Sequence, residues 1–345
     1  MSLRGTTSTL VAAAVAVTLV GGCSGGGQSM GQIRGDRTQA IASDHLSAAI
    51  LLRRAIGVLL APMNTDSATQ AQRLRRRALA ATAQPGKNDV PIMYEDDLVT
   101  PDGIHIHITM HWDSSYEETI TLPGGRSLLR VAGASVWDMF DSTTQITDTI
   151  SDGTVLTYTE LEQQVGYGLQ RTYTGTGTLP GGITVEYKLF EAGKAFHLRF
   201  AASDGIVFKC TVPFVVDLVD DWAIYRPNCV TGVTGSFQGQ GGACQVRLTG
   251  DESGWQRLLF AGAPGTLTGD LVSSFAVEPN MNQGSGTLVQ SDRLLGSLAW
   301  DASNQGTLTL MDARSEAVTP AASALRFALD LWLRAVALGA PNPGS

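Results

Sequence analysis

Three of the five histidines in this 345-residue chain lie close together, at positions 105, 107 and 111. His105 and His107 are two residues apart in a segment that alternates apolar and polar residues, which predicts a β-strand. Side chains two residues apart on a strand lie on the same face of the sheet. The two imidazole rings can therefore converge on one Zn, Cu or Ni ion. His111 lies four residues beyond His107, roughly 13 Å at ~3.3 Å per residue, which is too far to share that ion. A third ligand would come from a neighbouring strand, with Glu95 or Glu117 as candidates; the alternative is an ordinary polar sheet face.

A group of carboxylates lies just before the histidines: Glu95, Asp96, Asp97 and Asp102, followed by Gly103. Carboxylates around a turn are typical ligands of Ca²⁺. Their spacing does not match the EF-hand loop, however, and clusters of charge are usually solvated. The sequence therefore favours an exposed loop over a calcium site.

The motifs that mark common enzyme classes are missing from the sequence. Outside the Gly-rich segment 21–31 it has no Gly-x-Ser-x-Gly pattern for a nucleophilic serine. It also has no Ser-x-x-Lys pattern, no Walker A pattern, and no Gly-x-Gly-x-x-Gly between a strand and a helix. The paired carboxylates of glycosidases meet only in the fold, so glycan hydrolysis stays open. We therefore expect a protein without catalytic activity and assign no catalytic residue. A metal-dependent or glycan-acting enzyme is the alternative.

The cysteines other than Cys23 are Cys210, Cys229 and Cys244. They form no Cys-x-x-Cys pattern, which argues against a redox motif or a zinc knuckle. Outside the plasma membrane one disulfide is expected. Cys229 and Cys244 flank the Gly-rich turn 239–242 and are the predicted pair, whose bridge would contribute ~3 kcal/mol. Cys210 lies on an apolar strand face and is predicted to belong to the core.

The first residues of the chain have the layout of an export signal. A short positive start, with Arg4, precedes an uncharged apolar run at residues 10–20, too short to span a bilayer as a mature helix. Leu19-Val20-Gly21-Gly22-Cys23 then resembles the lipobox of bacterial lipoproteins. The resemblance implies cleavage before Cys23 and a thioether-linked diacylglycerol on its sulfur. It is limited to the signal segment, and we recognise no family for the rest of the chain.

This resemblance also implies a place in the cell. Residues 1–22 would be the signal peptide, and residues 23–36 the lipidated cysteine with a Gly-rich flexible tether. The mature protein would be held on a membrane of the cell envelope, outside the cytoplasm, with the lipid bilayer as its partner through Cys23. In bacteria with two membranes, Ser24 after the lipidated cysteine resembles the pattern that directs lipoproteins to the outer membrane.

Charge is distributed unevenly along the chain. Residues 1–88 hold ten Arg or Lys and three Asp or Glu, whereas residues 89–345 hold fourteen and twenty-nine. The acidic body argues against general nucleic-acid binding, which needs a basic surface. The basic part either faces anionic lipid headgroups near the anchor or is a solvated helix face.

The spacing of apolar residues predicts the elements. Within a helical segment at 37–90, residues 38–60 are predicted to form a helix capped by Asp36, and residues 66–81 a second helix. Residues 91–315 change to period two, with short turns such as Asp152-Gly153 that require antiparallel neighbours. Gly-Thr-Leu recurs at 265, 286 and 306, about one hairpin per repeat. In the C-terminal segment 316–345, residues 320–338 predict an apolar helix with one polar stripe, formed by Arg326, Asp330 and Arg334.

These elements predict an α+β protein that is mainly β: a large curved antiparallel meander or barrel-like sheet, with the N-terminal helices and the apolar C-terminal helix packed on it. The expected function is that of an exported, membrane-anchored, non-catalytic binding or structural protein whose partner is an unknown protein. The first alternative is a carrier of a small apolar ligand, such as a lipid, in a cavity of the curved sheet. We expect no cofactor unless His105 and His107 hold a divalent metal.

Overall fold

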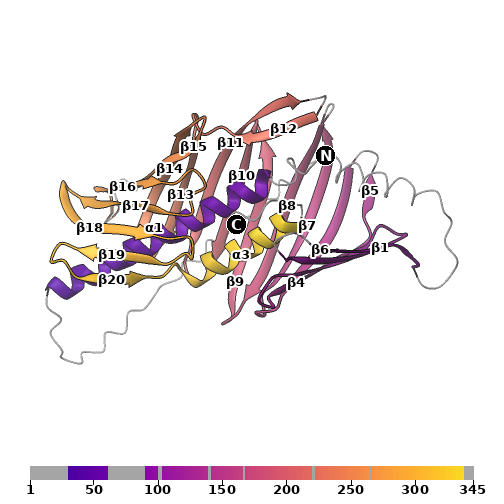
Figure 1. Ribbon diagram of the computed structural model, residues 1–345, viewed down its shortest axis with the longest axis horizontal. Coiled ribbons are helices and arrows are strands. Elements are labelled where there is room, and N and C mark those ends of the chain that lie inside the picture. The colour runs from indigo at the N-terminus through magenta and orange to yellow at the C-terminus, as the bar shows by residue number, and fades with distance from the viewer. Residues whose placement is uncertain are drawn as a thin grey trace, which may run out of the picture.

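Among the residues that the computed structural model describes, twenty strands form one antiparallel sheet and two helices lie against its concave face (Figure 1). The structure describes residues 30–60, 90–99, 103–138, 141–165, 168–219, 222–263, 266 and 268–337. The predicted fold class, a mainly β meander with helices packed on it, is confirmed.

The sheet is a meander in which nearly every strand pairs with the next one along the chain. Two short strands depart from this order: β5 pairs only with β6, so that β4 pairs with β6, and β12 pairs only with β11, so that β11 pairs with β13. Among the described residues, β1 pairs only with β2 and β20 only with β19, so the sheet is open at both ends rather than closed into a barrel. The strands are β1 (Ile92–Val99), β2 (His105–His111), β3 (Tyr116–Thr121), β4 (Ser127–Ala132), β5 (Val136–Asp138), β6 (Asp141–Ile150), β7 (Val155–Val165), β8 (Gly168–Leu179), β9 (Ile183–Ala192), β10 (Ala195–Ala202), β11 (Val207–Val219), β12 (Trp222–Pro227), β13 (Val233–Gly239), β14 (Gly242–Asp251), β15 (Gly254–Gly262), β16 (Leu271–Val277), β17 (Gly284–Gln290), β18 (Arg293–Trp300), β19 (Gly306–Leu310) and β20 (Ser315–Val318).

Short turns set the register of the meander. The turn between β8 and β9 uses Gly181 and Gly182 with φ of 87° and 76°, a region that glycine enters without strain. The turn between β6 and β7 contains Gly153, also with positive φ. These are the turns predicted from the sequence, and each leaves no room for anything but an antiparallel neighbour.

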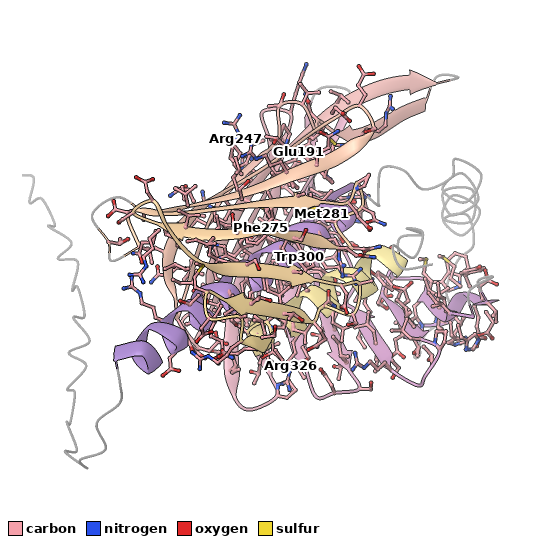
Figure 2. The ribbon with its side chains drawn as sticks, turned by 60° about the vertical axis from the view of Figure 1, so that its left-hand side comes forward. Glu191, Arg247, Phe275, Met281, Trp300 and Arg326 are labelled. Carbon is pink, nitrogen blue, oxygen red and sulfur yellow. The ribbon has the colours of Figure 1, made fainter. Side chains whose placement is uncertain are left out.

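Glycines of the last third make room for aromatic rings on the concave face. Phe275 of β16 and Trp300 of β18 lie on either side of β17, with ring centroids 5.3 Å apart (Figure 2). A Cβ atom on Gly284 would lie 2.2 Å from the Trp300 ring, and one on Gly286 would lie 2.7 Å from the Phe275 ring. The Gly-Thr-Leu repeat that includes Gly286 therefore serves close packing, and β17–β18 and β19–β20 each form one hairpin, as the repeat length predicts.

Helix α1 (Met30–Leu60) crosses the concave face and contacts β11–β13 and β18–β20 (Figure 1). Ile41, Leu46, Leu51 and Leu52 are buried along it, and Leu46 lies over Gly306 of β19. The helix begins at residue 30 rather than near 38. The prediction of Asp36 as its cap is therefore wrong, and so is the assignment of residues 30–36 to a flexible tether. Once a helix is nucleated, each further residue adds a hydrogen bond, and this outweighs the weak propensity of the glycines in its first turns.

Helix α3 (Ala322–Ala337) packs beside α1 and against the middle of the sheet. Phe327 is buried and stacks on Phe200 of β10, with ring centroids 4.3 Å apart. Arg326 donates a hydrogen bond to the carbonyl oxygen of Pro180 at 2.8 Å. Of the predicted polar stripe, Arg326 is half-buried and Asp330 is fully buried, and α1 lies beside this helix.

Several predictions from the sequence concern positions outside the described residues: the signal peptide at 1–22, the lipidated Cys23, the helix expected at 66–81, Asp102 and the side chain of Arg334. Neither helix that the structure describes is long and apolar enough to cross a membrane.

The dependence of the fold on α1 can be measured with Leu46→Ala. Leu46 is fully buried against the sheet, so we expect the free energy of unfolding in urea to fall by about 2–5 kcal/mol. The matched control is Leu325→Ala on α3, where the side chain is 38% exposed and we expect a loss below about 1 kcal/mol. Equal losses in the two variants would contradict the docking of α1.

Candidate functional site

Strands β1 and β2 bring two histidines and one aspartate together on the outer face of the sheet. His107 lies directly opposite Asp97 in the antiparallel register, while Ile106 points to the buried face. Oδ1 of Asp97 lies 3.0 Å from Nδ1 of His107 and 3.1 Å from Nε2 of His105. A single carboxylate oxygen is thus within hydrogen-bonding distance of both imidazole rings.

The second ring nitrogen of His107 also has partners. Its Nε2 lies 3.6 Å from Oε1 of Glu95 and 3.3 Å from Oγ1 of Thr109. Glu117, the other candidate third ligand, is opposite Thr109 in the register of β2 and β3. His111 lies apart from this group, with Nδ1 3.2 Å from the carbonyl oxygen of Val90. The predicted pair is therefore brought together, and Asp97 is the carboxylate that joins it.

The cluster is exposed and lies among negative charge. The side chains of His105, His107 and Asp97 are 51%, 34% and 61% exposed, so each can turn without disturbing the core. Strands β1, β2 and β3 contain no Lys or Arg. Within the described part of the chain, no group of three or more His, Cys, Asp or Glu side chains is placed so that it could hold a metal ion without rearrangement. As it stands, the cluster is a set of close contacts between imidazole nitrogens and carboxylate oxygens.

Asp97 was not predicted to lie beside the histidines, because the acidic run was expected to form an exposed loop. Glu95, Asp96 and Asp97 instead lie within strand β1, and Asp102 is outside the described residues. One signal could have found this strand: Pro101-Asp102-Gly103 is a turn sequence, and a turn directly before β2 implies a hairpin partner. Pairing across that turn places Asp97 beside the histidines.

A buried ionic network lies on the concave face of the neighbouring strands β3, β4 and β6. Nε and Nη2 of Arg130 donate to the two carboxylate oxygens of Asp148 at 2.9 and 3.1 Å, and Nη1 donates to Glu118 at 3.0 Å. All three side chains are buried. Burial alone would lower the pKa of Arg130, but the charge of Asp148 holds this pKa above its usual value. The network joins β3, β4 and β6 and is structural in character.

A second network continues this arrangement along β7 and β8. Nε of Arg171 donates to Glu162 at 2.6 Å, and the hydroxyl of Tyr173 donates to Glu160 at 2.9 Å. Burial, followed by the negative charge of Glu160, raises the pKa of Tyr173 well above its ordinary value, so the phenol stays protonated. In both networks the charged side chains are therefore bonded to partners on neighbouring strands.

Asp44 and His45 are two adjacent buried groups of α1. Oδ2 of Asp44 accepts a hydrogen bond from the backbone N–H of Gly241 at 2.7 Å, and burial raises the pKa of Asp44 to about 6. Nε2 of His45 lies 3.0 Å from Oγ of Ser273, and burial lowers the pKa of His45 to about 3. The imidazole is therefore neutral at physiological pH. Both side chains connect the helix to the sheet.

The predicted disulfide between Cys229 and Cys244 is not formed, and all three described cysteines are free. The carbonyl oxygen of Cys229 accepts from the N–H of Gly250, at the far end of β14. Cys244 lies six residues earlier in the same strand, roughly 20 Å away at ~3.3 Å per residue. Proximity to the turn 239–242 was therefore misleading, because the chain leaves that turn along an extended strand. Cys210 is buried in the core, as predicted.

No protein family, no curated protein and no solved structure matches this chain.

The ionic network on the concave face gives a test of stability. We expect Arg130→Met to lower the free energy of unfolding by about 3–5 kcal/mol, because Asp148 and Glu118 would remain buried without a compensating charge. The control is Arg314→Met, which breaks an exposed ion pair with Asp312 and should cost below about 1 kcal/mol. Urea titration of both variants measures the difference, and a small loss in Arg130→Met would show that the network is solvated.

Asp44 gives a test that depends on pH. The folded pKa of Asp44 is about 6 and the unfolded value is near 3.8, so the folded state binds more protons between these values. The contribution of Asp44 to the free energy of unfolding therefore rises as the pH falls through 6. Asp44→Asn removes the buried charge and keeps an acceptor for Gly241. We expect this variant to be more stable than the parent by about 1–3 kcal/mol at pH 8, with most of the gain lost at pH 4.

The measurement is urea unfolding of parent and variant at the two pH values. His45 titrates in both proteins, so its contribution cancels in the difference. A gain of the same size at pH 8 and pH 4 would show that the charge of Asp44 is not the cause.

Proposed function

We propose that the protein is exported and anchored by lipid on Cys23 in the cell envelope, where it has a non-catalytic binding or structural role. The apolar run at 10–20 and the segment Leu19-Val20-Gly21-Gly22-Cys23 support the anchor. Helix α1 begins at Met30, seven residues after Cys23, so the anchored end leads directly into the helix that crosses the sheet. Such an anchor would hold the whole sheet close to the membrane surface.

The observation that carries the proposed role is that the chain's own helices cover the concave face of the sheet. Leu46, Leu51 and Leu52 of α1 and Phe327 of α3 are buried against it. A partner is then left with the outer face and the two edges of the sheet. This supports a surface-binding or structural role over that of a carrier, which needs a cavity for its apolar ligand.

The anchor can be tested with Cys23→Ser in a bacterial host. We expect the variant to lose labelling by an alkyne analogue of palmitate and to keep residues 1–22, because a serine cannot form the thioether that precedes cleavage. Intact-mass analysis and in-gel detection of the label measure both effects. Cys229→Ser is the control and should keep the label and the cleaved N-terminus. A labelled or normally cleaved Cys23→Ser protein would refute the anchor.

Native mass spectrometry of the labelled parent protein separates the two roles. A mass that corresponds to the polypeptide and its covalent lipid is the outcome expected for a binding or structural protein. A further non-covalent lipid, bound one to one, would favour the carrier.

A further inference from the structure

We propose that the outer face of β1 and β2 carries a Zn²⁺ site whose ligands are Nε2 of His105, Nδ1 of His107 and the carboxylate of Asp97. The inference goes beyond the proposed anchoring and binding role, and it stands on the contacts of these three side chains alone. The proposed metal site lies on the outer face of the sheet, which faces away from the helices.

The first step is the convergence of the two imidazole rings. The ligating nitrogens of His105 and His107 lie 3.1 and 3.0 Å from the same oxygen of Asp97. Bonds from Zn²⁺ to nitrogen or carboxylate oxygen are about 2.0–2.2 Å long. The three groups must therefore close in by about 1 Å, and Asp97 must turn so that the ion takes the place of its oxygen. All three side chains are at least one-third exposed, which allows both movements.

The second step is the orientation of His107. Its other nitrogen, Nε2, faces Glu95 at 3.6 Å and Thr109 at 3.3 Å. A proton on Nε2 that is donated to Oγ1 of Thr109, or to Glu95 once its carboxylate moves closer, leaves the lone pair of Nδ1 directed toward Asp97. Metal-binding histidines are commonly held in this way by an outer carboxylate, which fixes the tautomer and raises the basicity of the ligating nitrogen.

The third step is the choice of ion. Two imidazole nitrogens and one carboxylate are a donor set for Zn²⁺, whereas Ca²⁺ and Mg²⁺ prefer oxygen ligands alone. Glu95, Asp97 and Glu117 make this part of the surface negative, and β1–β3 have no Lys or Arg to offset them. Three protein ligands leave a fourth position open to water or to a ligand from another molecule.

The test is isothermal titration of Zn²⁺ into the full chain, purified in detergent without a histidine tag and treated beforehand with a chelator. We expect one ion per chain. His105→Ala, His107→Ala and Asp97→Ala should each weaken binding by about 100-fold, and Glu95→Gln by about 10-fold, the lower end of the usual range for an outer partner. The matched control is His111→Ala, on the same strand but outside the cluster, which should bind as the parent does.

Three outcomes would overturn the proposal. The first is the absence of one-to-one binding in the parent. The second is Zn²⁺ binding that survives in the double variant His105→Ala/His107→Ala, and the third is an equal loss in His111→Ala. Titration with Ca²⁺ identifies the cause of the second outcome. If Ca²⁺ binds as tightly as Zn²⁺, and the binding of both ions survives replacement of the histidines, the carboxylates alone attract the ions and no zinc site exists. Urea unfolding of each variant confirms that it is folded.

Discussion

The structure depends on the burial of α1 against a sheet that does not close. An open antiparallel sheet of this width has one face of aromatic and aliphatic side chains, and contact with water would be unfavourable along its whole length. Helix α1 covers the side formed by β11–β20, with Leu46 and Leu52 fully buried, and α3 covers the middle through Phe327. The helices replace the opposite wall that a closed barrel would have. The contacts of His105, His107 and Asp97 lie on the opposite, outer face.

Polar contacts determine how α1 lies on that apolar surface. Asp44 accepts from Gly241, and the two terminal nitrogens of Arg53 donate to Asn282 and Asn304 at 3.0 and 2.8 Å. Apolar contacts alone tolerate many orientations, since they are not directional. Buried hydrogen bonds are satisfied only in one of them, because each unpaired partner would bear a desolvation cost. The helix is therefore held at a single position along the sheet by a few side chains near its middle and its end.

Period-two alternation and turn residues were enough to predict the meander, and apolar spacing was enough to predict both described helices. The features that were not predicted correctly depend on contacts between segments that are distant in the sequence. The acidic run that contains Asp97 has no clear alternation, so its place in β1 follows only from pairing with β2. The burial of Asp330 on α3 also depends on the packing of this helix in the fold, which the apolar spacing of its own residues does not describe. The separation of Cys229 from Cys244 likewise follows from the direction of β14. His105 and His107 were identified because a strand places them on one face without help from any other segment.

The position of α1 in the chain has a consequence for the order of folding. Most strands can pair as soon as the next one has been made, because the meander joins neighbours in sequence. Helix α1 is different: Ser43 donates to the carbonyl oxygen of Thr319, 276 residues later, and the sheet surface that it covers begins only at β11. Synthesis proceeds from the N-terminus, so the first described helix to emerge is among the last to find its binding surface. Until then its apolar side is unprotected, and this interval is the stage at which the nascent protein most needs a chaperone.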